Sequence, residues 1–240
     1  QVSGGVIEEP LKQAKAAIQD GLYDLGSRIL RRKLIEEELG EDTAREAVSL
    51  LLRCLYELGN HDGIMEILQS AETGSYVADT DIKRFWTALA NYEFGKHAIC
   101  LSLLEDFAET YPESEYLPKS VRLRAWCYLK QGKTDQALGV FESYAARFEG
   151  GPDYDSNLLE WGKALVNLDR AAEAKTVFQK IDGDLSDDPA VQEGKYWLSK
   201  LLLDEGELAS ASGLLMQLST NSAVHRNLRA RAWYTRALIS

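Results

Sequence analysis

Gly132-Lys133-Thr134 is the first run of residues in this sequence with the types that a catalytic or ligand site would use. It matches the end of a phosphate-binding loop, but the first glycine of that motif would stand five residues before Gly132, where the chain has Cys127. The motif also requires a preceding strand, whereas a helical pattern precedes these residues. We therefore interpret them as a turn between two helices.

His97 and Cys100 are three residues apart, a spacing at which two metal ligands can share one helix face. No second pair with zinc-like spacing accompanies them in the sequence, and Cys100 occupies a recurring position of small packing residues, so a buried thiol is the better interpretation. His61 and His225 stand alone near a turn and a loop, and no Gly-x-Ser-x-Gly motif is present. The sequence therefore predicts no catalytic residues, no metal site and no cofactor, and a protein that is not an enzyme.

Composition narrows the class of protein further. The 240 residues include 27 Lys and Arg against 38 Asp and Glu, a net charge of −11, which argues against a general nucleic-acid or anionic-membrane surface. Pro is scarce at 5 residues, while Leu, Ala, Glu and Lys are common, as is typical of helical proteins. No apolar run approaches the roughly 18–20 residues that a membrane-spanning helix needs.

The sequence repeats itself with a step of about 37 residues. A small packing residue recurs at Cys100, Ala137, Ala174 and Ala211, and an apolar residue follows four positions later at Leu104, Phe141, Phe178 and Leu215. A turn residue precedes each small residue by five positions, and the same turn recurs earlier, giving Gly21, Gly59, Gly95, Gly132, Asp169 and Gly206. The pattern predicts helix–turn–helix units, since glycine accepts positive φ at the end of a helix.

Six such units and the first helix of a seventh fit the chain. A single unit cannot bury its apolar face, but stacked neighbours form a continuous core, so we expect one all-α array over residues 1–240. Asp188-Pro189 predicts a capped helix start, and Thr43-Ala44-Arg45-Glu46 predicts a capping box. Because the helical pattern still runs at Ser240, we expect a piece of a longer protein.

The best unit, with Ala125, Gly132, Ala137 and Phe141, resembles the tetratricopeptide repeat (TPR). The resemblance covers essentially the whole chain, although the period is 37 rather than 34 and the usual Trp at position 4 is absent. It implies a right-handed superhelical solenoid whose first helices line a concave groove. The stretch 107–116, FAETYPESEY, resembles a motif of bacterial cell-envelope TPR proteins, namely outer-membrane assembly lipoproteins and the periplasmic coordinator of the Tol–Pal system. This second resemblance implies the periplasm or cell envelope, with the cytoplasm as the alternative.

The resemblance also implies which residues would face the groove. Mapping the family's groove positions onto the first helices yields a partner-binding set of cations and aromatics: Arg53, Tyr56, Phe85, Tyr92, Arg122, Trp126, Lys130, Lys163, Tyr196 and Lys200. Cations suit carboxylates and aromatic side chains serve as rigid anchors, so these types favour a peptide partner with acidic residues. The alternative interpretation is a solvated helix face. The family's chaperone-type carboxylate clamp needs Asn at position 9, which this chain lacks.

Two functions from different classes fit these observations. The first is a non-enzymatic scaffold that binds a protein segment in its groove, in the bacterial envelope. The alternative is a regulatory or docking module of a larger enzyme or transport assembly. Self-association through the open ends of the array is a third hypothesis.

Overall fold

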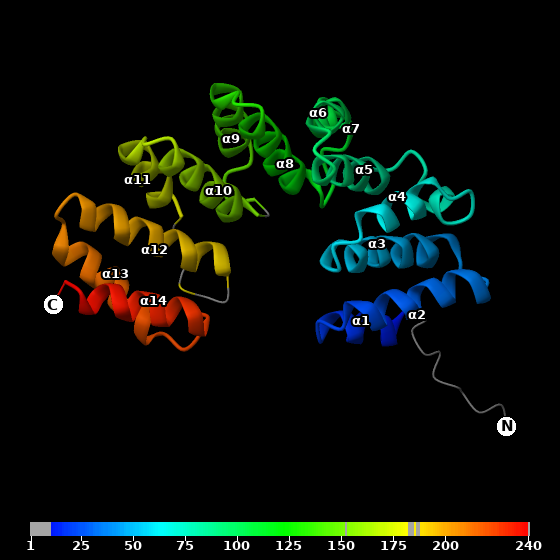
Figure 1. Cartoon of the computed structure of the whole chain (residues 1–240), viewed down its shortest axis with the longest axis horizontal. Coiled ribbons are helices and arrows are strands. Elements are labelled where there is room, and N and C mark those ends of the chain that lie inside the picture. The colour runs from blue at the N-terminus through cyan, green and yellow to red at the C-terminus, as the bar shows by residue number, and fades with distance from the viewer. Residues whose placement is uncertain (1–10, 152, 182–184, 186–187, 240) are drawn as a thin grey trace. The chain divides into compact units, whose positions relative to one another are not determined.

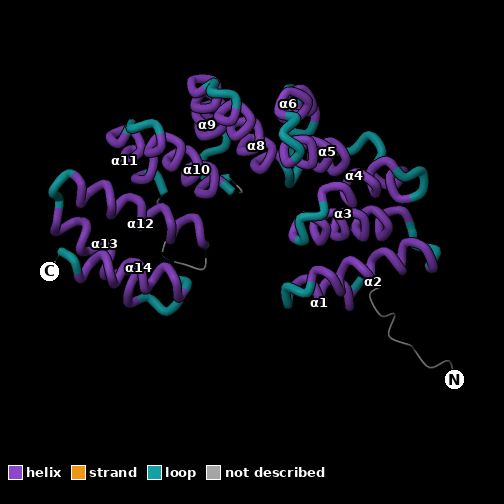
Figure 2. Tube along the Cα trace, in the orientation of Figure 1, coloured by secondary structure: helices purple, strands orange, loops and turns teal. Residues whose placement is uncertain are grey.

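The computed structural model describes residues 11–151, 153–181, 185 and 188–239, and all regular elements among them are helices (Figures 1 and 2). The prediction of an all-α fold is confirmed for these described residues. Two compact units divide the chain, the first ending at Gln131 and the second beginning at Gly132. A single array through both units stays a prediction.

The first unit stacks helix pairs in chain order. Its elements are α1 (Lys12–Gln19), α2 (Tyr23–Glu36), α3 (Glu41–Glu57), α4 (His61–Gln69), a 3-10 helix (Thr73–Val77), α5 (Asp81–Glu93), α6 (His97–Leu104), α7 (Phe107–Thr110) and α8 (Leu117–Lys130). Each pair packs on the next, as α2 does on α3 and α6 on α8. The second helix predicted after Gly95 is divided between α6 and α7, and Pro112 follows the end of α7.

The second unit continues the same alternation. It comprises α9 (Thr134–Arg147), α10 (Tyr154–Asn167), α11 (Ala171–Gln179), α12 (Pro189–Asp204), α13 (Leu208–Thr220) and α14 (Arg226–Ala237). The closest packing joins α10 to α11, α12 to α13 and α13 to α14. The order of the helices along the chain is given by these bounds, and the number of repeat units stays a prediction.

The predicted turn residues have the backbone conformation that the repeat requires. All six adopt positive φ: Gly21 (73°), Gly59 (67°), Gly95 (71°), Gly132 (70°), Asp169 (58°) and Gly206 (82°). After Gly59 the Asn60 amide donates to the Leu55 carbonyl at 2.8 Å, a bond that closes the helix end as in a Schellman motif. The periodic turn residues thus predicted positive φ correctly, even at Asp169, where aspartate replaces glycine.

The small residues and their apolar partners form the core. Cys100, Ala137, Ala174 and Ala211 are fully buried, as are Leu104, Phe141, Phe178 and Leu215. The helices α10 and α11 approach each other closely at Gly162, which is 37 residues after Ala125. A Cβ atom on Gly162 would lie 2.4 Å from Cε1 of Phe178. Small residues recur because the two helices of a pair lie so close together that a larger side chain would not fit between them.

Two predicted helix starts had different outcomes. Asp188 caps α12, since its side chain accepts from the Ala190 amide at 2.8 Å and Pro189 is the first helical residue. The capping box at Thr43 is wrong, because α3 already begins after Gly40 and Thr43 lies inside the helix. Glu41 starts that helix instead, where its negative charge suits the helix dipole and pairs with Arg45 at 2.9 Å.

Candidate functional site

The helices α3, α5 and α8, which Figure 1 labels in the first unit, are the first helices of successive pairs. Their side chains line a groove of about 650 Å³. Five of the ten predicted binding residues line it, namely Arg53, Tyr56, Phe85, Arg122 and Trp126. We call this site the α3–α5–α8 groove. Its remaining charged and aromatic lining residues are Glu46, Glu57, Trp86, Glu115, Tyr116 and Lys119.

Helical spacing places these side chains on one face of each helix. On α8, Lys119, Arg122 and Trp126 follow one another at intervals of three and four residues, and on α3 the same interval of three joins Arg53 to Tyr56. Such residues lie one above the other along a helix, so α3 and α8 each present a stripe of cations and aromatics, while α5 contributes Phe85, Trp86 and Leu89. The three sets of side chains meet at the groove.

Packed aromatic rings form the wall of the groove. The rings of Phe85 and Tyr116 stack with centroids 4.8 Å apart, and Trp86 meets Tyr56 and Tyr116 edge-on at 6.0 and 6.3 Å. The Tyr116 hydroxyl lies 2.8 Å from Oγ of Ser49. Burial raises the pKa of Tyr116, while its hydrogen bond with Ser49 opposes that rise. The rings of Phe85, Trp86 and Tyr116 are buried, whereas Tyr56 is exposed. Burial of those three rings and the bond from Tyr116 across to Ser49 of α3 restrain the wall.

The charged lining residues differ in whether they are paired. Arg53 and Arg122 make no ion pair among the described residues, whereas Glu46 bonds Lys15 at 3.0 Å. Lys119 places its ammonium 5.4 Å from the centre of the Tyr116 ring. The groove therefore offers two unpaired guanidinium groups beside an aromatic wall.

Two hydrogen-bond donors of the groove are buried without an acceptor. Nε1 of Trp86 and Nη1 of Arg122 have no partner at hydrogen-bond geometry, although Trp86 is near enough to influence the Tyr116 hydroxyl. Trp86 is 6% exposed and Arg122 is half-buried. Buried donors are nearly always satisfied in proteins, so two unsatisfied ones in one groove mark a place where a ligand or water can bind.

Two further predicted residues of the first unit, Tyr92 and Lys130, are outside the groove lining, and Tyr92 contacts one lining residue. The Tyr92 ring is 6.2 Å from that of Trp126 and meets His97 edge-on at 5.4 Å. Burial is the main cause that raises the pKa of Tyr92. Lys130 is exposed and is the last residue of α8.

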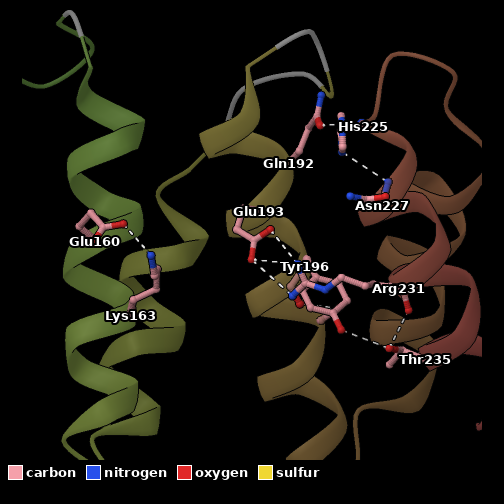
Figure 3. Close-up of polar contacts among 10 residues, drawn as sticks. Glu160, Lys163, Gln192, Glu193, Tyr196, His225, Asn227, Arg231 and Thr235 are labelled. Carbon is pink, nitrogen blue, oxygen red and sulfur yellow. Dashed lines mark hydrogen bonds and ion pairs between the residues drawn. The ribbon is translucent and has the colours of Figure 1, made fainter. Parts of the chain in front are cut away.

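The predicted residues of the second unit make separate local contacts (Figure 3). Lys163 bonds Glu160 on its own helix at 2.7 Å. Tyr196 is only 8% exposed, its hydroxyl lies 3.3 Å from Oγ1 of Thr235, and the Arg231 guanidinium covers its ring at 4.3 Å. Tyr196 thus packs between α12 and α14.

Lys200 completes the predicted set. This exposed side chain places its ammonium 4.7 Å from the centre of the ring of Trp197, which precedes it on α12. Nearby, Arg231 also bonds Glu193 at 3.3 Å, so the side chains around Tyr196 already have partners within the unit (Figure 3). The structure therefore brings five of the ten predicted residues together in one groove of the first unit. In the second unit, Tyr196 contacts side chains of α14, and Lys200 contacts Trp197 on α12.

Sequence reasoning missed Trp86 and Tyr116 as groove residues. Trp86 directly follows the predicted Phe85, and Tyr116 is the last aromatic of the stretch 107–116, just before α8 begins. A register uncertain by one residue rotates a helix position by about 100°, which is enough to exclude Trp86 from the mapped face. The aromatic just before a first helix was the available signal for Tyr116.

Other reactive groups in the described part of the chain make packing contacts. Cys100 and Cys127 are buried, and the hydrogen bond between their thiols raises the pKa of Cys100. Among the described residues, no three His, Cys, Asp or Glu side chains are grouped to hold a metal ion. A search of the same residues finds no helix with the length and apolar character to cross a membrane.

Comparison with known proteins identifies one repeat directly. Residues 123–150 match the tetratricopeptide repeat family, and they include Ala125, Gly132, Ala137 and Phe141. The predicted TPR is therefore confirmed for this segment. No curated protein matches the chain at significant similarity.

Three of the solved structures that match this chain are of TPR or TPR-like repeats. Two crystal structures of putative kinesin light chain repeats from Podosopora anserina are 16% and 18% identical, with TM-scores of 0.44 and 0.43. They cover 94% of this chain, which in turn covers 95% and 98% of theirs. A thermophilic TPR protein from Thermus thermophilus is 18% identical over 95% of this chain and 97% of its own, with a TM-score of 0.44.

Proposed function

We propose that the protein is a non-enzymatic scaffold that binds a segment of a protein partner in the α3–α5–α8 groove. The observation that carries this proposal is the pair of unpaired cations, Arg53 and Arg122, beside the aromatic wall. Tyrosine, tryptophan and arginine dominate the binding energy of protein interfaces, and a groove of about 650 Å³ has the size of a ligand site.

The same partner would carry acidic residues, since its charges would meet the unpaired guanidinium groups. The predicted residues outside the groove lining, Tyr92, Lys130, Lys163 and Lys200, remain candidates for further contacts. Tyr196 is a weaker candidate because a partner would first have to displace Arg231 from its ring.

We further propose a bacterial cell-envelope location. The support is the stretch 107–116, whose aromatics have a structural role here: Phe107 packs on Tyr111 at 5.2 Å, and Tyr116 stacks on Phe85. Fractionation of cells that express the native gene tests this proposal. Recovery of the protein with cytoplasmic markers alone would contradict it.

Affinity capture tests the binding proposal. The full chain and its Arg53→Glu/Arg122→Glu variant are immobilised, and retained proteins are quantified by mass spectrometry. We expect the specific partner to fall by at least about tenfold, because the loss of charge-assisted bonds at an interface costs about 1.4 kcal/mol or more. The matched control is Lys12→Glu/Arg32→Glu, which reverses two exposed charges of the same unit.

Equal capture by the wild-type chain and by the groove variant would contradict the proposal. Circular dichroism of both variants keeps a folding defect from imitating a lost contact. A captured partner that is itself an enzyme or transport subunit would support the alternative, a docking module of a larger assembly.

A further inference from the structure

We infer that the α3–α5–α8 groove binds a side-chain carboxylate of the partner segment between Arg122 and the indole N–H of Trp86. This inference deepens the proposed function and rests on it. It adds the chemical group that is recognised and assigns Trp86, which is outside the predicted set, as a specificity-determining residue.

The first step of the argument is the pair of unsatisfied donors. Nε1 of Trp86 and Nη1 of Arg122 are buried and have no acceptor within hydrogen-bond geometry. Both side chains line the groove. A group that accepts two hydrogen bonds would satisfy both, and a carboxylate has two oxygens for this purpose. A bond from a charged donor to a charged acceptor is also about twice as strong as a neutral one.

The second step concerns the other charges of the groove. Glu57 and Glu115 are exposed, and Glu46 already bonds Lys15. Arg122, by contrast, is half-buried and has no ion pair among the described residues. Its attraction to an anion is therefore screened less by solvent and salt than that of the exposed charges at the rim. The other cations that line the groove, Arg53 and Lys119, are exposed, so the selectivity for an anion comes mainly from Arg122.

The third step concerns what flanks the carboxylate. Tyr56, Phe85, Trp86, Tyr116 and Trp126 surround the two donors with aromatic surface, which favours apolar neighbours in the bound segment. The groove extends over three successive first helices, so a chain can pass along it with an acidic side chain directed inward. The occupant is therefore an internal Glu or Asp between apolar residues.

Nuclear magnetic resonance of the indole N–H groups tests the inference on the full chain. The probes are acetyl-Leu-Glu-Leu-amide and its matched control, acetyl-Leu-Gln-Leu-amide, which have no charged ends. Trp86→Phe identifies the Trp86 resonance. We expect the Glu peptide to move that resonance saturably and to bind at least about tenfold more tightly than the Gln peptide, because only the Glu side chain is charged.

Variants locate the source of that preference. Arg122→Gln should bring the affinity for the Glu peptide down to that for the Gln peptide. Arg32→Gln, an exposed arginine on α2, should leave the preference unchanged. Inorganic phosphate at matched ionic strength should not displace the Glu peptide, since it lacks the apolar neighbours.

Three results would overturn the inference: equal affinity for the two peptides, no saturable shift at Glu-peptide concentrations up to roughly tens of millimolar, or full displacement by phosphate. If partner capture still depends on Arg53 and Arg122 in that event, the proposed function stands and the recognised group is different. Equal capture of the partner by the wild-type chain and by the Arg53→Glu/Arg122→Glu variant would instead contradict the proposed function.

Discussion

Replacing Gly162 by alanine sets two effects of similar size against each other. Gly162 lies inside α10, and alanine is favoured over glycine in a helix interior by about 0.8–1.0 kcal/mol. The added Cβ, however, would lie 2.4, 2.5 and 2.8 Å from Cε1, Cζ and Cδ1 of Phe178. Overpacking of a core costs about 1–3 kcal/mol. The net sign depends on whether the Phe178 ring can move.

The surroundings of Phe178 leave its ring little room. The side chain is fully buried in a cluster with Leu165, Ala174 and Val177, and its plane is nearly parallel to that of Trp197 at 6.4 Å. We therefore take the upper part of the overpacking range. Subtracting the helix-propensity gain leaves a net loss of about 1–2 kcal/mol in the free energy of unfolding.

Urea unfolding, followed by circular dichroism and tryptophan fluorescence, measures this loss. A loss of about 1–2 kcal/mol lowers the urea midpoint by roughly half to one molar. The matched control is Gly213→Ala in α13, where a Cβ meets nothing within 4 Å, so that variant should be more stable by up to about 1 kcal/mol.

Phe178→Leu adds an internal check, because a smaller side chain gives the new methyl group room. The double variant Gly162→Ala/Phe178→Leu should lose less stability than the sum of the single variants. A Gly162→Ala protein as stable as Gly213→Ala would refute the reasoning, and so would strict additivity in the double variant.

Three further predictions concern the turns, a thiol and the aromatic wall. Asp169→Gly should stabilise the chain by about 0.5–1 kcal/mol and Gly206→Ala should destabilise it by about 1 kcal/mol, because both positions have positive φ; thermal unfolding of the pair checks the opposite signs. Burial raises the pKa of Cys54 from 9.0 to about 11. The free energy of unfolding should therefore be highest below pH 9 and fall by about 2–3 kcal/mol as the pH rises through 11. Urea unfolding at several pH values should show a smaller fall for Cys54→Ala, and an equal fall in both proteins would contradict this prediction. Tyr116→Phe removes the 2.8 Å bond to Ser49 and should cost about 1 kcal/mol in urea unfolding, whereas no change would show that the bond adds nothing to stability.

Local sequence patterns were enough to predict the helix pairs and their turns. A turn at positive φ is determined by a few neighbouring residues. The periodic recurrence of those residues was therefore enough to predict all six turn positions. The buried small residues at Cys100, Ala137, Ala174 and Ala211 followed from the same period. Each repeat packs mainly on its neighbours in the chain, which keeps the determining information local.

Finer placement within helices could be predicted only in part. The start of α3 was placed at Thr43 although Glu41 already opens the helix, because several polar residues there can cap or extend it. Among the groove positions, Phe85 was chosen and the adjacent Trp86 was not. Successive residues of a helix point about 100° apart, so a mapping by helix position assigned only Phe85 to the groove face, although both residues line the groove.

By itself, the sequence determined an all-α chain of helix pairs with a 37-residue step and a cation- and aromatic-rich set of first-helix residues. Only the tertiary structure decided which of those side chains meet. It joined Arg53 and Arg122 with Trp86 and Tyr116 in one groove, and it covered Tyr196 with Arg231 from a separate helix, α14. The physical reason is that periodicity specifies the face of one helix, whereas burial and pairing depend on the side chains that neighbouring helices bring against it.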